Sequence, residues 1–295
     1  MNHLLNSKKL LLLIFFLSIS IQQIQLHASD FGRSFARKAE TNTSIAGQFL
    51  IISFVIGNII AWSMGAHPRF YDQTPYTQDE QEYIQELQQE IQSYPDEAEA
   101  QKELGIIHFR HNDLDSASEA LNSALEVEPN HAESLAVWGA NEAKSAGAMW
   151  DFTFGLWKLS RIDDAVEGLN RAIELEPDNI NVRLFHLNTL GELENRRDSL
   201  HYAFLDEQWY IEKNESNPKY LPEDVQLEFL DALTRLYLVK FKIADEENRD
   251  KNHQTALSYF NQLKQLPIDD EKKEERIQKI ENKFLNQNIQ FKTTE

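Results

Sequence analysis

The sequence predicts an all-α protein in which helical hairpins stack into a solenoid behind an N-terminal signal or anchor region. Small residues and leucines recur at the spacing of a helical hairpin in residues 98–131, and the same pattern returns in residues 132–179. In addition, residues 44–66 carry no charged side chain. With 295 residues, the chain is long enough for neighbouring hairpins to bury a continuous core between them.

Residues 98–131 have the composition that two closely packed antiparallel helices need. Three small residues allow the helices to approach each other: Gly105, Ala117 and Ala124. Three leucines fill the seam between them: Leu104, Leu114 and Leu121. Asn112 and Asp113 end the first helix because their side chains compete for backbone hydrogen bonds, and Pro129 ends the second. The segment therefore predicts a helix–turn–helix unit.

The order of these residues resembles the tetratricopeptide repeat, a helix–turn–helix unit of about 34 residues. The family positions for leucine, glycine, alanine and proline are matched over the whole unit by Leu104, Gly105, Ala117, Leu121, Ala124 and Pro129. A second copy in residues 132–179 matches with Ala165, Leu169, Ala172 and Pro177. The resemblance implies a solenoid over residues 77–286.

The second copy is longer than the family unit and carries an insert at about residues 144–160 that is rich in aromatic side chains. Several envelope-associated tetratricopeptide proteins without an assigned activity look similar here. Two interpretations are open. In the first, Trp150, Phe154 and Trp157 form an exposed anchor that contacts a partner or a membrane surface. In the second, they form an extension that folds back onto the solenoid. We favour the second interpretation.

The remaining segments follow from helix starts and stops. Residues 67–76 are predicted to be a linker, and Thr77 to Glu80 form a capping box that opens a leading helix. Beyond the second copy the pattern weakens. It predicts two degenerate helical pairs, at residues 180–213 and 222–267. A charged C-terminal cap is predicted at residues 270–286 and a tail at residues 287–295.

The N-terminal region contains two apolar segments. Residues 1–28 are predicted to be a secretory signal or a first membrane segment, because Lys8 and Lys9 precede an uncharged apolar run. Residues 44–66 are predicted to be a transmembrane helix, since at about 1.5 Å per residue they span about 30 Å of hydrocarbon. If only one segment crosses, the solenoid lies outside the cytoplasm, and if both cross it lies on the cytoplasmic face. Arg33, Arg37 and Lys38 favour a periplasmic or other extracytoplasmic location in the cell envelope.

Charge and composition restrict the function classes. The net charge is −19, and only three of the 48 acidic side chains precede Thr77. An acidic solenoid repels phosphate backbones, which argues against a nucleic-acid partner and leaves a basic or apolar protein surface compatible. The sequence has no cysteine, which excludes disulfides and thiolate chemistry.

No catalytic constellation is present, because the sequence lacks a glycine-rich phosphate loop, His-Glu-x-x-His and Gly-x-Ser-x-Gly. We therefore expect no enzyme, no cofactor and no small-molecule substrate. His108 and His111 lie three residues apart on a predicted helix, where they either pack or bind a metal. We favour packing, because His108 occupies a family position for an aromatic core residue.

The resemblance implies that the first helices of successive repeats line a concave groove for a peptide or a partner helix. Carried over by position, the groove residues are Glu99, Lys102, Ile106, Phe109, Arg110, Glu133, Ala136, Ala140, Ala143, Lys144, Asn181, Leu184 and Asn188. One family branch clamps a C-terminal carboxylate with lysines and asparagines. Lys102 fits that clamp, but Ile106 replaces an asparagine, so a chaperone-tail receptor is disfavoured.

The sequence thus predicts a non-enzymatic, membrane-tethered scaffold that binds a peptide or protein partner. We expect an accessory of an envelope assembly, secretion or transport complex. The alternative is a structural protein that self-assembles into homo-oligomers through the insert or the C-terminal end.

Overall fold

A computed structural model describes residues 36–63, 67–194, 196–217, 220–268 and 271–286. These residues fall into two compact units, the first ending at Ile60 and the second beginning at Ala61, and each is described by itself. Every regular element in the described residues is a helix, which confirms the all-α class. The predicted signal segment and C-terminal tail lie outside the described residues.

The first unit contains helix α2 (Ala36–Ala61). Among the side chains of α2 that the structure describes, seven large apolar ones are exposed: Leu50, Ile51, Ile52, Phe54, Ile56, Ile59 and Ile60. Asn58 interrupts this run, and its side chain donates to the Phe54 carbonyl at 2.9 Å. Within the described residues, no helix combines the length and the apolar character needed to cross a membrane. Helix α2 begins before the predicted transmembrane segment of residues 44–66 and ends at Ala61, and residues 64–66 lie outside the described residues.

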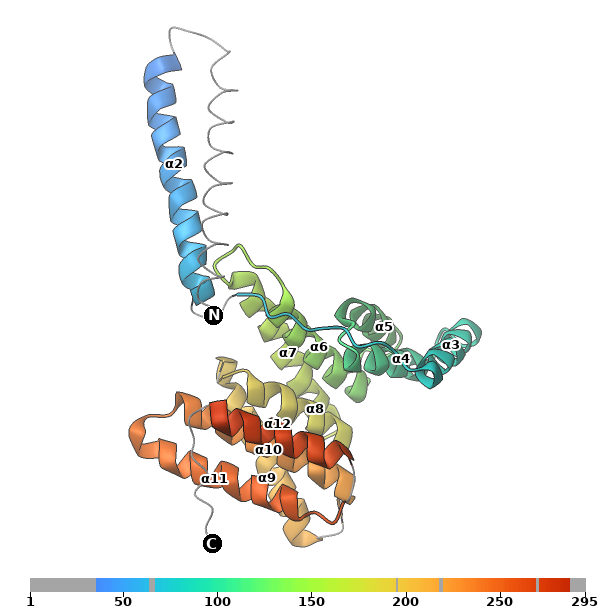
Figure 1. The fold of residues 1–295 in the computed structure, drawn as a ribbon. Helices are drawn as coiled ribbons and strands as arrows, with labels where there is room; N and C mark the ends of the chain where they lie inside the picture. The colour runs from blue at the N-terminus through green and yellow to red at the C-terminus, as the bar shows by residue number, and fades with distance from the viewer. Residues whose placement is uncertain (1–35, 64–66, 195, 218–219, 269–270, 287–295) are drawn as a thin grey trace. The chain divides into compact units, whose positions relative to one another are not determined.

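The second unit is a succession of helix pairs (Figure 1). After the leading α3, four pairs are formed by consecutive helices: α4 with α5, α6 with α7, α8 with α9, and α10 with α11. The first helices also contact one another in order, α4 with α6, α6 with α8, and α8 with α10. The bounds of these helices are α3 (Gln78–Ser93), α4 (Ala98–Arg110), α5 (Leu114–Val127), α6 (Ala132–Ala148), α7 (Leu156–Leu175), α8 (Ile180–Glu192), α9 (Ser199–Ser216), α10 (Glu223–Ile243), α11 (Glu246–Gln265) and α12 (Glu271–Asn286).

The predicted small residues lie where the helices of a pair touch. Ala117 and Ala124 have no exposed surface. A Cβ atom added at Gly105 would lie 2.6 Å from Leu121 Cγ, closer than van der Waals contact allows. The predicted capping box at Thr77 is also present, with Thr77 and Glu80 satisfying each other's backbone amides. The close packing of the first pair and the capping box before α3 are therefore confirmed.

Residues 67–76, predicted to be a linker, are held along α4 and α6. The Arg69 amide donates to the Gly147 carbonyl at 2.8 Å, and the Thr74 amide donates to the His111 carbonyl at 3.1 Å. The Tyr76 hydroxyl lies 2.7 Å from His108 Nδ1. Because these contacts fix both ends of the segment, it has a defined path across the two helices.

Two adjacent acidic residues of α9 hold the C-terminal pairs together. Asp206 is fully buried and accepts from Arg183 Nη1 at 2.8 Å, while His186 Nδ1 lies 2.5 Å from its other oxygen. Glu207 accepts from the Tyr237 hydroxyl at 3.0 Å and the Tyr259 hydroxyl at 2.6 Å. Asp206 thus joins α8 to α9, and Glu207 joins α9 to α10 and α11.

Candidate functional site

The predicted groove residues come from α4, α6 and α8, which contact one another in that order. Ala136 and Ala140 are buried at 0% and 3% exposure and line no open surface. Ala143 lines a separate cavity of about 50 Å³ with Arg69 and Lys158. The other predicted residues divide into three parts: a polar network near the helix N-termini, an aromatic floor, and an open cavity.

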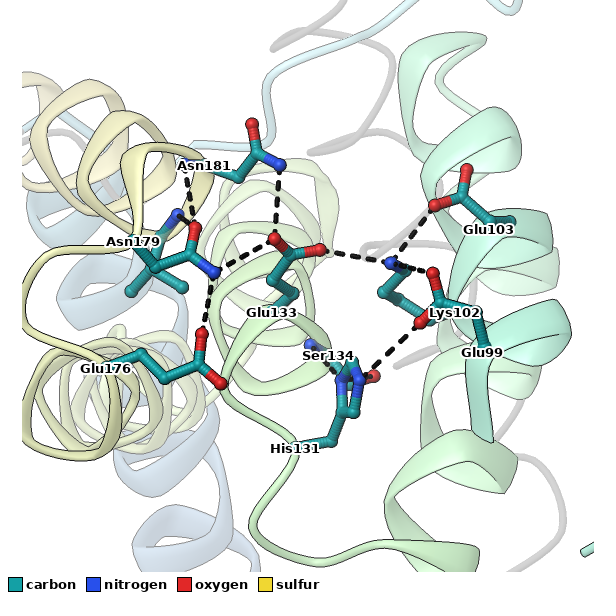
Figure 2. A network of polar contacts seen from close by, with 10 residues as sticks. Glu99, Lys102, Glu103, His131, Glu133, Ser134, Glu176, Asn179 and Asn181 are labelled. Atoms are coloured by element: carbon teal, nitrogen blue, oxygen red, sulfur yellow. Dashed lines mark hydrogen bonds and ion pairs between the residues drawn. The ribbon is translucent and has the colours of Figure 1, made fainter. Parts of the chain in front are cut away.

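The polar network is centred on Lys102, whose side chain is 5% exposed (Figure 2). Its ammonium lies 2.6 Å from Glu99, 3.1 Å from Glu103 and 3.0 Å from Glu133. The second oxygen of Glu133 accepts from the side-chain amides of Asn179 at 3.0 Å and Asn181 at 3.1 Å. The network therefore links the starts of α4, α6 and α8.

The charges in this network are matched internally. Burial alone would lower the pKa of Lys102, but hydrogen bonds to Glu99, Glu133 and Glu103 outweigh burial and raise that pKa. Burial alone would raise the pKa of Glu133, but hydrogen bonds from Asn179, Lys102 and Asn181 lower it. Lys102 is fully engaged by carboxylates of its own chain. This geometry leaves it no place in a clamp for a ligand carboxylate, whereas the surface around it is acidic.

The aromatic floor lies beyond this network. The rings of Phe109 on α4 and Phe185 on α8 meet edge to face with centroids 6.0 Å apart. Together with Ile106, they pack against a small core that contains Leu121. The Lys144 ammonium lies 4.9 Å from the Phe109 ring centre, and burial lowers the pKa of Lys144. These contacts give the middle of the predicted groove a closed, apolar base.

The open part is a cavity of about 670 Å³. Four predicted groove residues line it: Arg110, Asn181, Leu184 and Asn188. The rest of its lining comes from later elements of the chain and includes Phe185, Asp224, Val225, Leu227, Glu228, Ile268 and Arg276. The cavity therefore continues the groove from α4 and α8 onto α10 and α12.

The charged groups around the cavity are unequally paired. Arg276 forms ion pairs with Glu228 and, at 3.3 Å, with Asp231. Arg110 and Asp224 have no ion-pair partner among the described residues. The cavity thus offers one unpaired cation from α4 and one unpaired carboxylate from α10 beside an apolar wall, an arrangement suited to a peptide with side chains of mixed character.

Sequence reasoning missed the α10 and α12 side of this cavity. Residues 223–244 were recognisable as a helix, and Leu227 as one of its apolar positions. The repeat pattern weakens after residue 179, so no repeat position could be assigned to Asp224 or Glu228. Arg276 lies in a segment whose charge pattern is that of a solvated helix face.

The aromatic insert forms the end of α6, the loop from Met149 to Gly155 and the start of α7. Trp150, Phe154 and Trp157 are each about half exposed, at 53%, 46% and 60%. Asp151 is fully buried beneath them. Burial alone would raise the pKa of Asp151, but hydrogen bonds from Thr153, Lys158 and Trp157 lower it.

The two neighbouring histidines of α4 hold the segment before α3. His108 contacts Tyr76, and His111 Nε2 lies 3.0 Å from Glu80 Oε1. In the part of the chain that the structure describes, no group of three or more histidine or acidic residues is arranged to hold a metal ion. Packing and hydrogen bonding account for both histidines.

Comparison with models of known protein families gives no match, and no curated protein matches the chain.

Proposed function

We propose that this protein is a non-enzymatic scaffold with a tetratricopeptide-type solenoid, and that it binds a peptide segment of a partner protein in the cavity between α4, α8 and α10. The observation that carries the proposal is the open cavity of about 670 Å³ lined by Arg110, Asn181, Leu184 and Asn188. Four positions that the repeat pattern assigned to the groove thus lie around one opening.

The lining indicates the kind of segment that fits. Leu184, Phe185 and Val225 offer an apolar surface for one or two side chains of the ligand. Arg110 would pair with a carboxylate, and Asp224 with a basic group, since neither has an ion-pair partner among the described residues. The acidic network around Lys102 disfavours further acidic residues of the ligand at that end.

Photo-crosslinking in cells tests this proposal. A photoreactive phenylalanine analogue at Leu184 should give an adduct with a partner protein, and Arg110→Glu should remove the adduct. The matched control is the same probe at Leu175, an exposed position on α7. An adduct of two copies of this chain would favour the self-assembling alternative. Equal partner adducts at both positions, or adducts at neither, would contradict the groove.

We also propose that the N-terminal part attaches the protein to a membrane, with the groove outside the cytoplasm as an accessory of an envelope complex. Support comes from the apolar side chains that α2 exposes, Leu50 and Phe54 among them. A reporter that is active only outside the cytoplasm, fused after Glu295, tests the location. Activity is the expected result, and an inactive fusion would place the groove on the cytoplasmic face.

A further inference from the structure

The exposed aromatic loop between α6 and α7 has a second property that its sequence alone does not reveal. From Met149 to Trp157 it contains one ionisable side chain, Asp151, and that carboxylate has no exposed surface. Its outward face is therefore uncharged, although the chain as a whole carries a net charge of −19. The exposed fractions of its large side chains are 53% for Trp150, 48% for Phe152, 46% for Phe154, 61% for Leu156 and 60% for Trp157.

The loop holds these side chains outward in a fixed conformation. Asp151 accepts from the Thr153 amide at 2.6 Å and the Thr153 hydroxyl at 2.5 Å. Its second oxygen accepts from the Lys158 amide at 2.9 Å, which ties the loop to the first turn of α7. Phe154 adopts a positive φ of 59°, so the chain turns sharply immediately before Gly155. A buried carboxylate thus stabilises a loop whose apolar side chains point to solvent.

A third tryptophan, from a distant part of the sequence, packs against the aromatic side chains of the loop. Trp62 follows Ala61, the last residue of the apolar helix α2, directly in the chain. Its ring centre lies 5.5 Å from that of Trp150 and 5.7 Å from that of Phe152. Its indole nitrogen donates to the Asp151 carbonyl at 3.0 Å. The chain therefore leaves α2 and enters this aromatic surface without an intervening linker.

We infer that this surface, formed by Trp62, Trp150, Phe152, Phe154, Leu156 and Trp157, rests in the headgroup layer of a phospholipid bilayer. Tryptophan is enriched at that depth because its ring is apolar while its N–H remains able to donate. Because the loop exposes no charge, its contact with lipid avoids the cost of desolvating charged groups. The acidic remainder of the chain would carry that cost. Direct continuity with α2 selects lipid as the occupant, because α2 exposes apolar side chains next to it in the sequence. The inference rests on the membrane attachment proposed above.

Fluorescence quenching by lipid tests this surface in the full chain. The protein is reconstituted into phosphatidylcholine vesicles whose acyl chains carry bromine near the headgroup. We expect tryptophan emission to be quenched, and Trp157→Phe to remove part of the quenched signal. Trp138→Phe is the matched control. Trp138 lies on α6, outside the loop, and its indole nitrogen donates to Asn122 at 3.0 Å. Its removal should leave the quenched signal unchanged.

Flotation of the same vesicles separates failure of this inference from failure of the attachment. Protein that floats with the vesicles while Trp157→Phe leaves the quenching unchanged would overturn the lipid contact and keep the attachment. The same conclusion would follow if aqueous acrylamide reached Trp157 equally with and without vesicles, the result expected if a protein partner covers the loop. Protein that does not float would contradict both.

Discussion

The Lys102 ammonium on α4 lies 3.0 Å from the Glu133 carboxylate on α6, and this pair joins the first helices of two successive helix pairs. Glu133 in turn accepts from Asn179 and Asn181 at the start of α8. These contacts therefore link α4, α6 and α8, the three helices that carry the predicted groove residues. The ion pair with Glu133 also engages Lys102, one of the predicted groove residues, within its own chain.

Replacing Lys102 with methionine should destabilise the fold. The change leaves three carboxylates without their cation, and we expect the free energy of unfolding to fall by about 1.5–3 kcal/mol. Urea denaturation followed by circular dichroism measures the loss. Lys264→Met is the control, since Lys264 forms a 3.6 Å ion pair with Glu281 in which both side chains are exposed. That variant should lose at most about 1 kcal/mol. Equal losses would contradict a buried role for Lys102.

The same network predicts a pH dependence. Hydrogen bonds from Asn179, Lys102 and Asn181 hold the folded-state pKa of Glu133 below the ordinary glutamate value of 4.5. Its contribution to stability is therefore complete above about pH 4.5 and is lost as the pH falls through the folded pKa. Glu133→Gln should unfold more easily than the parent at pH 7, and the difference between the two free energies should narrow below pH 4.5. A difference that stays constant with pH would show that Glu133 acts by packing alone.

Enlarging a small residue in the first helix pair should overpack it. Ala117 has no exposed surface, so Ala117→Leu should lower the free energy of unfolding by about 1–3 kcal/mol. Glu119→Leu on the exposed side of the same helix controls for the added apolar volume. If the Ala117 variant melts like the parent, the two helices are not packed as closely as the structure has them.

Removing Asp206 should weaken the junction between α8 and α9. Asp206→Ala leaves Arg183 and His186 buried without their partner, and we expect a loss of about 3–5 kcal/mol. Asp250→Ala on the exposed face of α11 should leave stability nearly unchanged. Native-state hydrogen exchange would place the loss in α8 and α9. Exchange that is unchanged there would refute the role assigned to Asp206.

The short-range features of the fold were predictable, whereas the long-range polar contacts were not. Gly105 and Ala117 indicate close helix packing in the sequence, because only small residues fit where two helices touch. The hydrogen bonds of Asp206 and Glu207 could not be predicted, because their partners lie on other helices. The ion pair of Lys102 was unpredictable for the same reason, since Glu133 lies 31 residues further along the chain.

The candidate groove shows the same division. Arg110, Asn181, Leu184 and Asn188, which the repeat positions assigned to a groove, line one cavity in the structure. Asp224 and Arg276 were missed because their positions depend on how α10 and α12 pack against α8. The exposure of the insert could not be predicted, because no periodicity reveals that Asp151 is buried and bonded to the start of α7.

The central claim is that the cavity beside Arg110 binds a peptide, and the affinity of that peptide tests it most directly. Titration calorimetry would measure the affinity of the peptide captured by crosslinking at Leu184 for three proteins: the parent, Arg110→Glu and Arg249→Glu. Arg249 is an exposed arginine on α11 and serves as the matched charge reversal. The account predicts that Arg110→Glu weakens binding by about tenfold or more, which corresponds to about 1.4 kcal/mol, while Arg249→Glu leaves it unchanged. Equal affinities for all three proteins would contradict the account.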